Sequence, residues 1–161
     1  MIAARLHDDN RGNRAPGRSK LVEILNRRSG SIYKGMAARA AKQFINMPFT
    51  LAEFRDWLLM KFGPNGEARC EYSGEMILVE NFTVDHRRPI SRGGSFDLDN
   101  LALCSEKHNL RKGNMSKVEY QAFKDFLVIH LPPEVQDSIW KRLEIGDVQR
   151  FSYFRRQRKG K

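Results

Sequence analysis

The sequence predicts an α+β protein in which helices flank a small core of short strands. Two observations support this fold class. Apolar residues recur at helical spacing in the first and last thirds of the chain. Capping sequences at residues 50–53 and 116–119 mark the starts of two of these predicted helices. Between them, residues 66–115 contain short β-type segments separated by glycine-rich turns. We therefore expect one domain, because 161 residues are enough to bury a single core.

Composition and patterning divide the chain into five segments. Residues 1–18 are poor in apolar side chains and rich in polar ones, which predicts a disordered basic arm. Residues 19–65 are expected to form an N-terminal helical extension. Residues 116–146 are expected to form C-terminal helices that pack on the core formed by residues 66–115. Residues 147–161 are expected to be a basic tail, because they carry six basic side chains against one acidic one.

The N-terminal extension is expected to contain three helices. The first two are predicted at residues 21–25 and 32–44. The sequence Met47-Pro48 then interrupts the pattern, because a residue that precedes proline disfavours helix. The third helix begins at the capping box of residues 50–53. Its apolar face comprises Leu51, Phe54, Trp57, Leu58 and Phe62.

The central segment is expected to follow the order strand, loop, strand, helix. Residues 68–72, 82–84 and 101–103 have the length and apolar content of short strands. Ser105 is a candidate N-cap for a helix that extends to about Lys112.

The second capping box, at residues 116–119, opens the next predicted helix. The apolar face of this helix comprises Val118, Ala122, Phe126 and Ile129. Pro132-Pro133 ends it and starts another helix, because proline fits the first helical turn. The side chains that this last helix directs inward are expected to be Val135, Ile139 and Leu143.

The net charge narrows the class of partner. Lys and Arg number 29 against 19 Asp and Glu, a formal net charge of +10. This balance favours a polyanionic binding partner, and nucleic acid is a better candidate than an acidic membrane. Many basic proteins, however, carry a positive surface without binding a polyanion. No apolar run is long enough to cross a bilayer. Arg11, Arg14 and Arg18 lie where a signal peptide would need its apolar stretch, so we expect a cytoplasmic protein without a membrane partner.

Polar side chains with complementary chemistry lie close together in the central segment. Asp85 can offer a carboxylate oxygen to a hard divalent cation, and Asn109 can offer a second oxygen from the following helix. His86 can take a proton from water, because the ordinary pKa of imidazole lies near neutrality. Asn100 is expected to bond to the backbone of its own glycine-rich loop and so to hold the segment that carries His86. These groups suit metal-assisted hydrolysis of a phosphodiester.

Cationic side chains surround this cluster. They are expected to contact the phosphates of DNA, because arginine and lysine bind phosphate oxygens. The predicted phosphate-binding residues are Arg87, Arg88, Arg92, Arg111 and Lys112. The basic runs at the two termini are expected to add further phosphate contacts.

The motif resembles that of the HNH endonuclease family. The matching residues are Cys70, Ser73, Gly74, Val84, Asp85, His86, Pro89, Gly93, Gly94, Asp99, Asn100, Leu103, Cys104, Asn109 and Lys112. The resemblance implies a ββα-metal fold and DNA cleavage with one divalent metal ion, Mg²⁺ or Mn²⁺. It implies that Asp85 and Asn109 bind the metal, with His108 as the second candidate for the latter position. His86 would be the general base, and Asn100 would order the loop.

Within residues 66–115 the sequence departs from the family pattern at the cysteines. Many members hold a structural zinc ion with two Cys-x-x-Cys pairs, whereas this chain has only Cys70 and Cys104. With His108 they would supply three ligands, short of the four in a structural zinc site. The chain is therefore closer to the zinc-free type, and we expect both cysteines to be buried packing residues.

The predicted function is metal-dependent hydrolysis of double-stranded DNA, by nicking or by double-strand cleavage, in a monomer or dimer. The resemblance implies products with 5′-phosphate and 3′-hydroxyl ends, and it favours an origin in a phage or mobile element. One alternative is a non-catalytic DNA-binding protein that retains the fold. Another is an accessory subunit of a larger phage or mobile-element complex that processes DNA.

Overall fold

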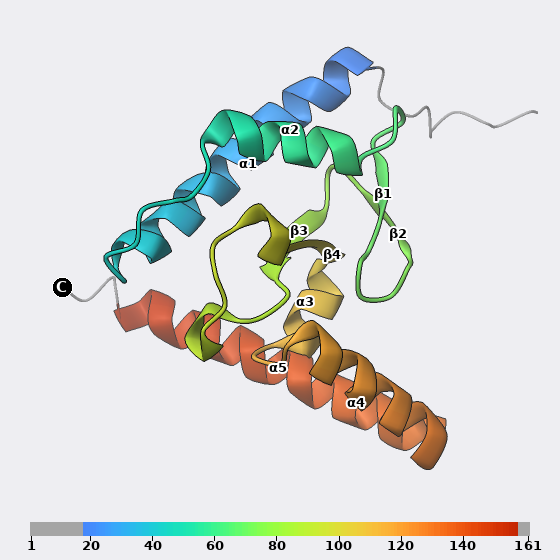
Figure 1. Ribbon diagram of the computed structural model, residues 1–161. Helices are drawn as coiled ribbons and strands as arrows, with labels where there is room; N and C mark the ends of the chain where they lie inside the picture. The colour runs from blue at the N-terminus through green and yellow to red at the C-terminus, as the bar shows by residue number, and fades with distance from the viewer. Residues whose placement is uncertain (1–17, 158–161) are drawn as a thin grey trace, which may run out of the picture.

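A computed structural model describes the backbone of residues 18–157 and the side chains of residues 20–146. Apart from Arg18, the expected basic arm lies outside the described residues, as do the side chains of the expected basic tail. The described residues form N-terminal helices, two β-hairpins with a short helix, and C-terminal helices (Figure 1). The predicted α+β class is confirmed. No helix in this part of the chain is long and apolar enough to span a membrane.

The N-terminal layer contains α1 (Arg18–Ala41) and α2 (Leu51–Lys61), which pack against each other (Figure 1). Because α1 is one continuous helix, the prediction of two separate helices was wrong. Gly30 and Gly35 lower helix propensity, but neither breaks the helical backbone as proline would. α2 begins after the predicted capping box at Thr50. The side chains that α2 buries are Phe54, Trp57 and Leu58.

The first hairpin joins β1 (Glu67–Arg69) to β2 (Met76–Leu78) in an antiparallel pair. We expected one strand over residues 68–72 here, and β2 was not predicted. The left-handed backbone of Gly74, with φ of 74°, reverses the chain so that β2 returns along β1. The amide of Cys70 closes the turn with a hydrogen bond to the carbonyl of residue 75.

The second hairpin joins β3 (Phe82–His86) to β4 (Leu101–Ser105), and α3 (Glu106–Lys112) follows directly. This strand, loop, strand, helix order agrees with the prediction. The register places His86 opposite Leu101, so the end of β3 lies beside the start of β4. The two hairpins are separate two-stranded sheets.

The hydrophobic core joins all three parts of the described chain. One cluster of buried side chains includes Phe54 of α2, Phe82 of β3 and Trp140 of the C-terminal layer. Cys70 and Cys104 belong to it as free, buried thiols, which agrees with their expected packing role. Burial raises the pKa of the Cys104 thiol to about 12, so this side chain is a packing group and not a nucleophile at neutral pH.

α4 (Lys117–His130) begins at the predicted capping box, but its predicted apolar face does not enter the core. Three side chains of that face are 78%, 52% and 72% exposed, namely Val118, Phe126 and Ile129. Tyr120 and Leu127 are buried in their place. Two apolar stripes at helical spacing compete on this helix. The stripe with Tyr120 is buried because its ring packs edge-on against Trp140, with 6.0 Å between ring centroids.

α5 (Pro133–Gln157) starts at the second proline, as predicted. Ile139 and Leu143 pack against the core, as expected, whereas Val135 is 42% exposed. The backbone remains helical beyond residue 146, where a tail was expected to begin. In Figure 1, α4 and α5 lie on the opposite side of the hairpins from α1 and α2.

Candidate active site

The last two residues of β3, Asp85 and His86, line one pocket of about 300 Å³. Three segments form its walls: β3, the following loop with Pro89 and Phe96, and α1 with Arg39. Side chains alternate between faces along a regular strand. Asp85 and His86 nevertheless both line this pocket, which lies at the end of β3.

The carboxylate of Asp85 is held through one of its two oxygens. Oδ2 accepts a hydrogen bond of 2.7 Å from the hydroxyl of Tyr72. The ammonium of Lys112 lies 2.8 Å from the same oxygen as an ion pair, off the direction of a good hydrogen bond. Burial and the Asp85 charge raise the pKa of Tyr72, so its hydroxyl stays protonated and donates. No hydrogen bond among the described residues uses Oδ1, which leaves it available to another ligand.

His86 is a buried imidazole, 7% exposed. Its ring lies edge-on against Phe96, with 5.5 Å between centroids. Burial, and then the charge of Arg39, lower the pKa of His86 to about 4, although Asp85 acts in the opposite direction. The ring is therefore neutral at neutral pH. Its Nε2 is buried and has no hydrogen-bond partner among the described residues.

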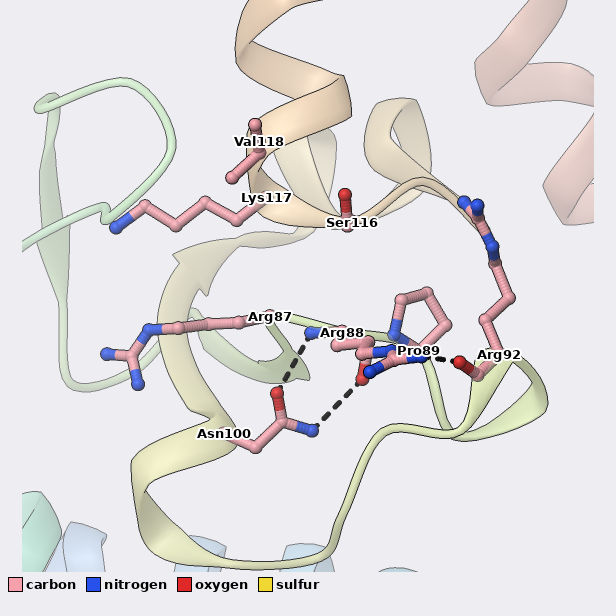
Figure 2. Close-up of a pocket in the computed structure, with 8 residues that line it drawn as sticks. All are labelled: Arg87, Arg88, Pro89, Arg92, Asn100, Ser116, Lys117 and Val118. Atoms are coloured by element: carbon pink, nitrogen blue, oxygen red, sulfur yellow. Dashed lines mark hydrogen bonds between the residues drawn. The ribbon is translucent and has the colours of Figure 1, made fainter.

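Asn100 connects the two ends of the loop that follows His86 (Figure 2). Its side chain accepts a hydrogen bond of 2.9 Å from the amide of Arg88 and donates to the carbonyl of the same residue. A third bond, of 2.7 Å, reaches the carbonyl of Ser95. The loop is also tight at Gly94, where an added Cβ would lie 1.9 Å from a backbone oxygen of Arg88. Asn100 thus contacts loop backbone, and the loop continues directly from His86.

His108 and Asn109 on α3 are the two candidates for a second metal ligand. Both ring nitrogens of His108 face other groups: Nδ1 lies 2.7 Å from the Tyr120 hydroxyl and Nε2 lies 3.7 Å from the Glu75 carboxylate. The side chain of Asn109 is half-buried and makes no hydrogen bond to a described residue. It lies three residues before Lys112, whose ammonium reaches the β3 carboxylate. Neither residue lines the pocket of Asp85 and His86, and of the two only Asn109 has a side chain without a hydrogen-bond partner among the described residues.

These side chains fit a hard divalent cation. A carboxylate oxygen of Asp85 and the amide oxygen of Asn109 match the donors that Mg²⁺ and Mn²⁺ prefer. Among the described residues, no group of three or more His, Cys, Asp and Glu side chains could hold a metal. Two protein oxygens would leave the remaining positions to water and phosphate. The unpaired Nε2 of His86 supports the fit, because a buried ring nitrogen requires a polar partner such as water in the pocket.

The segment that carries these side chains matches a known family. The model of the family described as HNH endonuclease aligns with residues 68–114. Residues 68–114 are an HNH endonuclease domain. The match includes α3 and both hairpins except Glu67, the first residue of β1, and leaves the flanking helices outside. No curated protein matches the chain.

Most cations of the HNH domain that were expected to bind phosphate are paired with carboxylates. Four of the five have such partners: Arg87 with Glu71, Arg92 with Glu119, Arg111 with Glu144 and Lys112 with Asp85. In Figure 2, the side chains of Arg87 and Lys117 extend to the same side, where both reach Glu71. Arg88 is the one of the five with no carboxylate within 4 Å among the described residues. Lys112 is also fully buried, a placement that differs from the expected DNA contact.

Sequence reasoning missed two residues of this site. Tyr72 lies within the HNH domain, but nothing in the sequence indicates that its hydroxyl reaches a carboxylate thirteen residues away. Arg39 lies outside the HNH domain, and no local pattern links α1 to the end of β3. Only the packing of α1 brings its charge to the pocket.

Proposed function

We propose that the protein is a metal-dependent DNA endonuclease in which His86 acts as the general base. The observation that carries the proposal is the buried, unpaired Nε2 of His86, in the pocket that Asp85 also lines. A neutral imidazole with a free nitrogen can take a proton from a water molecule that attacks phosphorus. The HNH endonuclease family of residues 68–114 supports DNA as the substrate.

The environment of His86 suits this role once a phosphate is bound. Its pKa of about 4 keeps the ring neutral, so the nitrogen is ready to accept a proton. A base with so low a pKa is weak, but the negative charge of an incoming phosphate raises the pKa toward neutrality. Phe96 packs on the ring, and Asn100 restrains the loop that follows it. Both contacts keep the imidazole in place while the proton moves.

Asp85 and Asn109 would hold the divalent cation. When bound, such a cation neutralises charge on the pentacovalent phosphorus and on the departing 3′ oxygen. Tyr72 and Lys112 contact Oδ2 of Asp85 and so direct its other oxygen toward a ligand. Removal of either contact is expected to weaken the site, because a carboxylate with free rotation loses more entropy on binding.

Each chain has one such pocket in its HNH domain, so one binding event should cut one strand. Double-strand cleavage would then require two chains or two successive events. Hydrolysis with departure of the 3′ oxygen gives products with 5′-phosphate and 3′-hydroxyl ends.

A plasmid assay tests the proposal directly. Supercoiled DNA incubated with the protein and Mg²⁺ or Mn²⁺ is expected to become nicked, and excess EDTA is expected to abolish the reaction. His86→Ala is expected to slow cleavage by about a hundredfold or more, because it removes the base. Asp85→Asn is expected to reduce cleavage and to raise the metal concentration that gives half-maximal activity, because the site loses its charged ligand.

Two exposed residues supply matched controls. His130→Ala on α4 and Asp137→Asn on α5 change the same residue types outside the pocket and should cleave as wild type does. Cleavage by His86→Ala at the wild-type rate would show that the assigned base is wrong. DNA binding without any cleavage by the wild-type protein would instead support a non-catalytic DNA-binding protein.

A further inference from the structure

The C-terminal end of α1 reaches the pocket of Asp85 and His86 although it lies outside the HNH domain. Arg39, Lys42 and Gln43 line this pocket together with the end of β3. They precede the HNH domain by more than twenty residues in the chain. The proximity is therefore a product of tertiary packing.

Several contacts fix the position of this end of α1. Met36 and Ala40 are 1% and 0% exposed, so one face of this part of α1 is buried against the protein. Nearer the middle of the helix, Arg28 donates to the carbonyls of Glu80 and Phe82, just before and at the start of β3. Its guanidinium also lies 4.6 Å from the ring centroid of Phe82. α1 thus packs directly on β3, the strand that ends with Asp85 and His86.

The cations at this end differ from the four paired cations of the HNH domain. Arg39 and Lys42 are exposed, and neither has a carboxylate within 4 Å among the described residues. Four of the five cations of the HNH domain that were predicted to bind phosphate already have such partners. A phosphate that approaches Asp85 meets negative charge, so it needs cations at the same pocket. An arginine fork suits two phosphate oxygens, and a lysine adds a second point charge.

The turn after α1 adds an aromatic side chain. Phe44 is 100% exposed, and its φ of 57° is a left-handed conformation that costs energy in a residue with a Cβ. A fully exposed ring on a strained turn has no folding benefit among the described residues. Such a ring suits contact with the bases or sugars of a nucleic acid.

We propose that residues 39–44 form a DNA-binding element that positions the scissile strand at the pocket of Asp85 and His86. Arg39 and Lys42 bind backbone phosphates, and Phe44 packs against an adjacent base or sugar. The proposal rests on the proposed endonuclease function for the identity of the polyanion as DNA. It assigns to residues 39–44 positive charge for phosphate binding that the paired cations of the HNH domain do not supply.

Binding without cleavage tests the element separately from catalysis. The His86→Ala protein in EDTA is titrated with a fluorescein-labelled DNA duplex, and fluorescence anisotropy gives Kd over a series of KCl concentrations. Adding Arg39→Ala and Lys42→Ala is expected to weaken binding about tenfold or more. It should also reduce the slope of log Kd against log salt by about two, because two phosphate contacts are lost. Phe44→Ala is expected to weaken binding without changing that slope.

A charge-matched pair on the same helix is the control. Arg27→Ala with Lys34→Ala removes the same charge from exposed positions outside the element and should leave Kd within about twofold. Arg39→Lys with Lys42→Arg keeps the charge and should keep the salt slope. If both alanine pairs weaken binding equally, only net charge matters and the proposal is overturned. Absence of DNA binding by His86→Ala overturns it as well.

Cleavage by proteins with an intact His86 separates the two proposals. If plasmid cleavage depends on His86 but Arg39→Ala with Lys42→Ala retains kcat/KM, residues 39–44 are not the binding element and the endonuclease function stands. If the wild-type protein does not cleave but binding still depends on Arg39 and Lys42, the endonuclease function falls and the binding element stands. Support for both requires a raised KM in the alanine pair, with a smaller effect on kcat.

Discussion

Asp85 and His86 are adjacent in sequence, yet their side chains have different surroundings. Asp85 keeps one oxygen for an ion pair and a tyrosine hydroxyl and leaves the other without a protein partner. His86 is buried beside Phe96, and that burial lowers its pKa. Burial in this pocket disfavours the charged form of the imidazole. The end of β3 thus places a carboxylate group beside a neutral imidazole.

The loop after His86 depends on one residue without a side chain. An added Cβ at Gly94 would lie 1.9 Å from the carbonyl oxygen of Arg88, and backbone must move to relieve the clash. Gly94→Ala is expected to destabilise the fold by about 1–3 kcal/mol, measured by urea denaturation. It should also reduce plasmid cleavage, because the Asn100 contacts that restrain this loop would shift.

Gly30 provides the control for that substitution. No atom lies within 4 Å of a Cβ added there, in the middle of α1. Gly30→Ala is expected to raise stability by up to about 1 kcal/mol, because alanine has the higher helix propensity. Equal stability changes at the two glycines would contradict the steric explanation for Gly94.

Among the elements, α3 connects strand β3 to the C-terminal layer. Lys112 reaches back to Asp85, and His108 reaches outward to the Tyr120 hydroxyl of α4. Arg111 pairs with Glu144 of α5 and lies over the Trp140 ring. A seven-residue helix is too short to be stable alone, so these contacts hold it in position.

A carboxylate joins the start of α4 to the loop that follows His86. Glu119 forms the capping box with Ser116 and pairs with Arg92 in the loop. Arg92, followed by the hydrogen bonds from Ser116, lowers the pKa of Glu119 to about 2. A pKa below that of the unfolded chain means that ionised Glu119 stabilises the fold. This stability is present above about pH 4.3 and is lost as the pH falls through about 2.

Glu119→Gln is therefore expected to lower the melting temperature at pH 7. The difference from wild type should shrink as the pH falls from about 4 toward 2, because the wild-type carboxylate becomes protonated. Circular dichroism melts across this range measure both effects. Glu23→Gln, an exposed residue of α1 without an ion pair among the described residues, is the control. A melting-temperature difference that does not change with pH would exclude the ionic explanation.

On the scale of the whole molecule, the flanking helices belong to the same core as the HNH domain. The buried cluster contains Leu25 of α1, Leu58 of α2, Leu101 of β4 and Leu127 of α4. A two-stranded hairpin has marginal stability without such partners. The HNH strands therefore depend on helices that the family match does not include.

This shared core predicts one cooperative unfolding transition. The two tryptophans report on opposite flanks, because Trp57 lies in α2 and Trp140 in α5. Trp57→Phe and Trp140→Phe leave one reporter each, and their urea midpoints by fluorescence should coincide with that by far-ultraviolet circular dichroism. Each variant's own circular dichroism midpoint corrects for the effect of its substitution. Separate midpoints for the two reporters would show that the flanks unfold independently.

Sequence reasoning succeeded where local rules decide the structure. The capping boxes at Thr50 and Ser116 were predictable because each needs only residues three apart. Strand β2 was not predicted, because a three-residue strand gains its stability from its partner. The buried face of α4 was predicted wrongly, because two apolar stripes share the helical period and only Trp140 across the core selects Tyr120.

The sequence by itself determined the α+β class and the HNH motif, because short-range spacing places a carboxylate, an imidazole and two amides in a recognisable order. Only the tertiary structure decided how the charges are used. Carboxylates from other elements pair with Arg87, Arg92 and Arg111, while α1 brings Arg39 to the pocket. The reason is physical: electrostatic energy depends on distance in space, which composition and spacing along the chain do not specify.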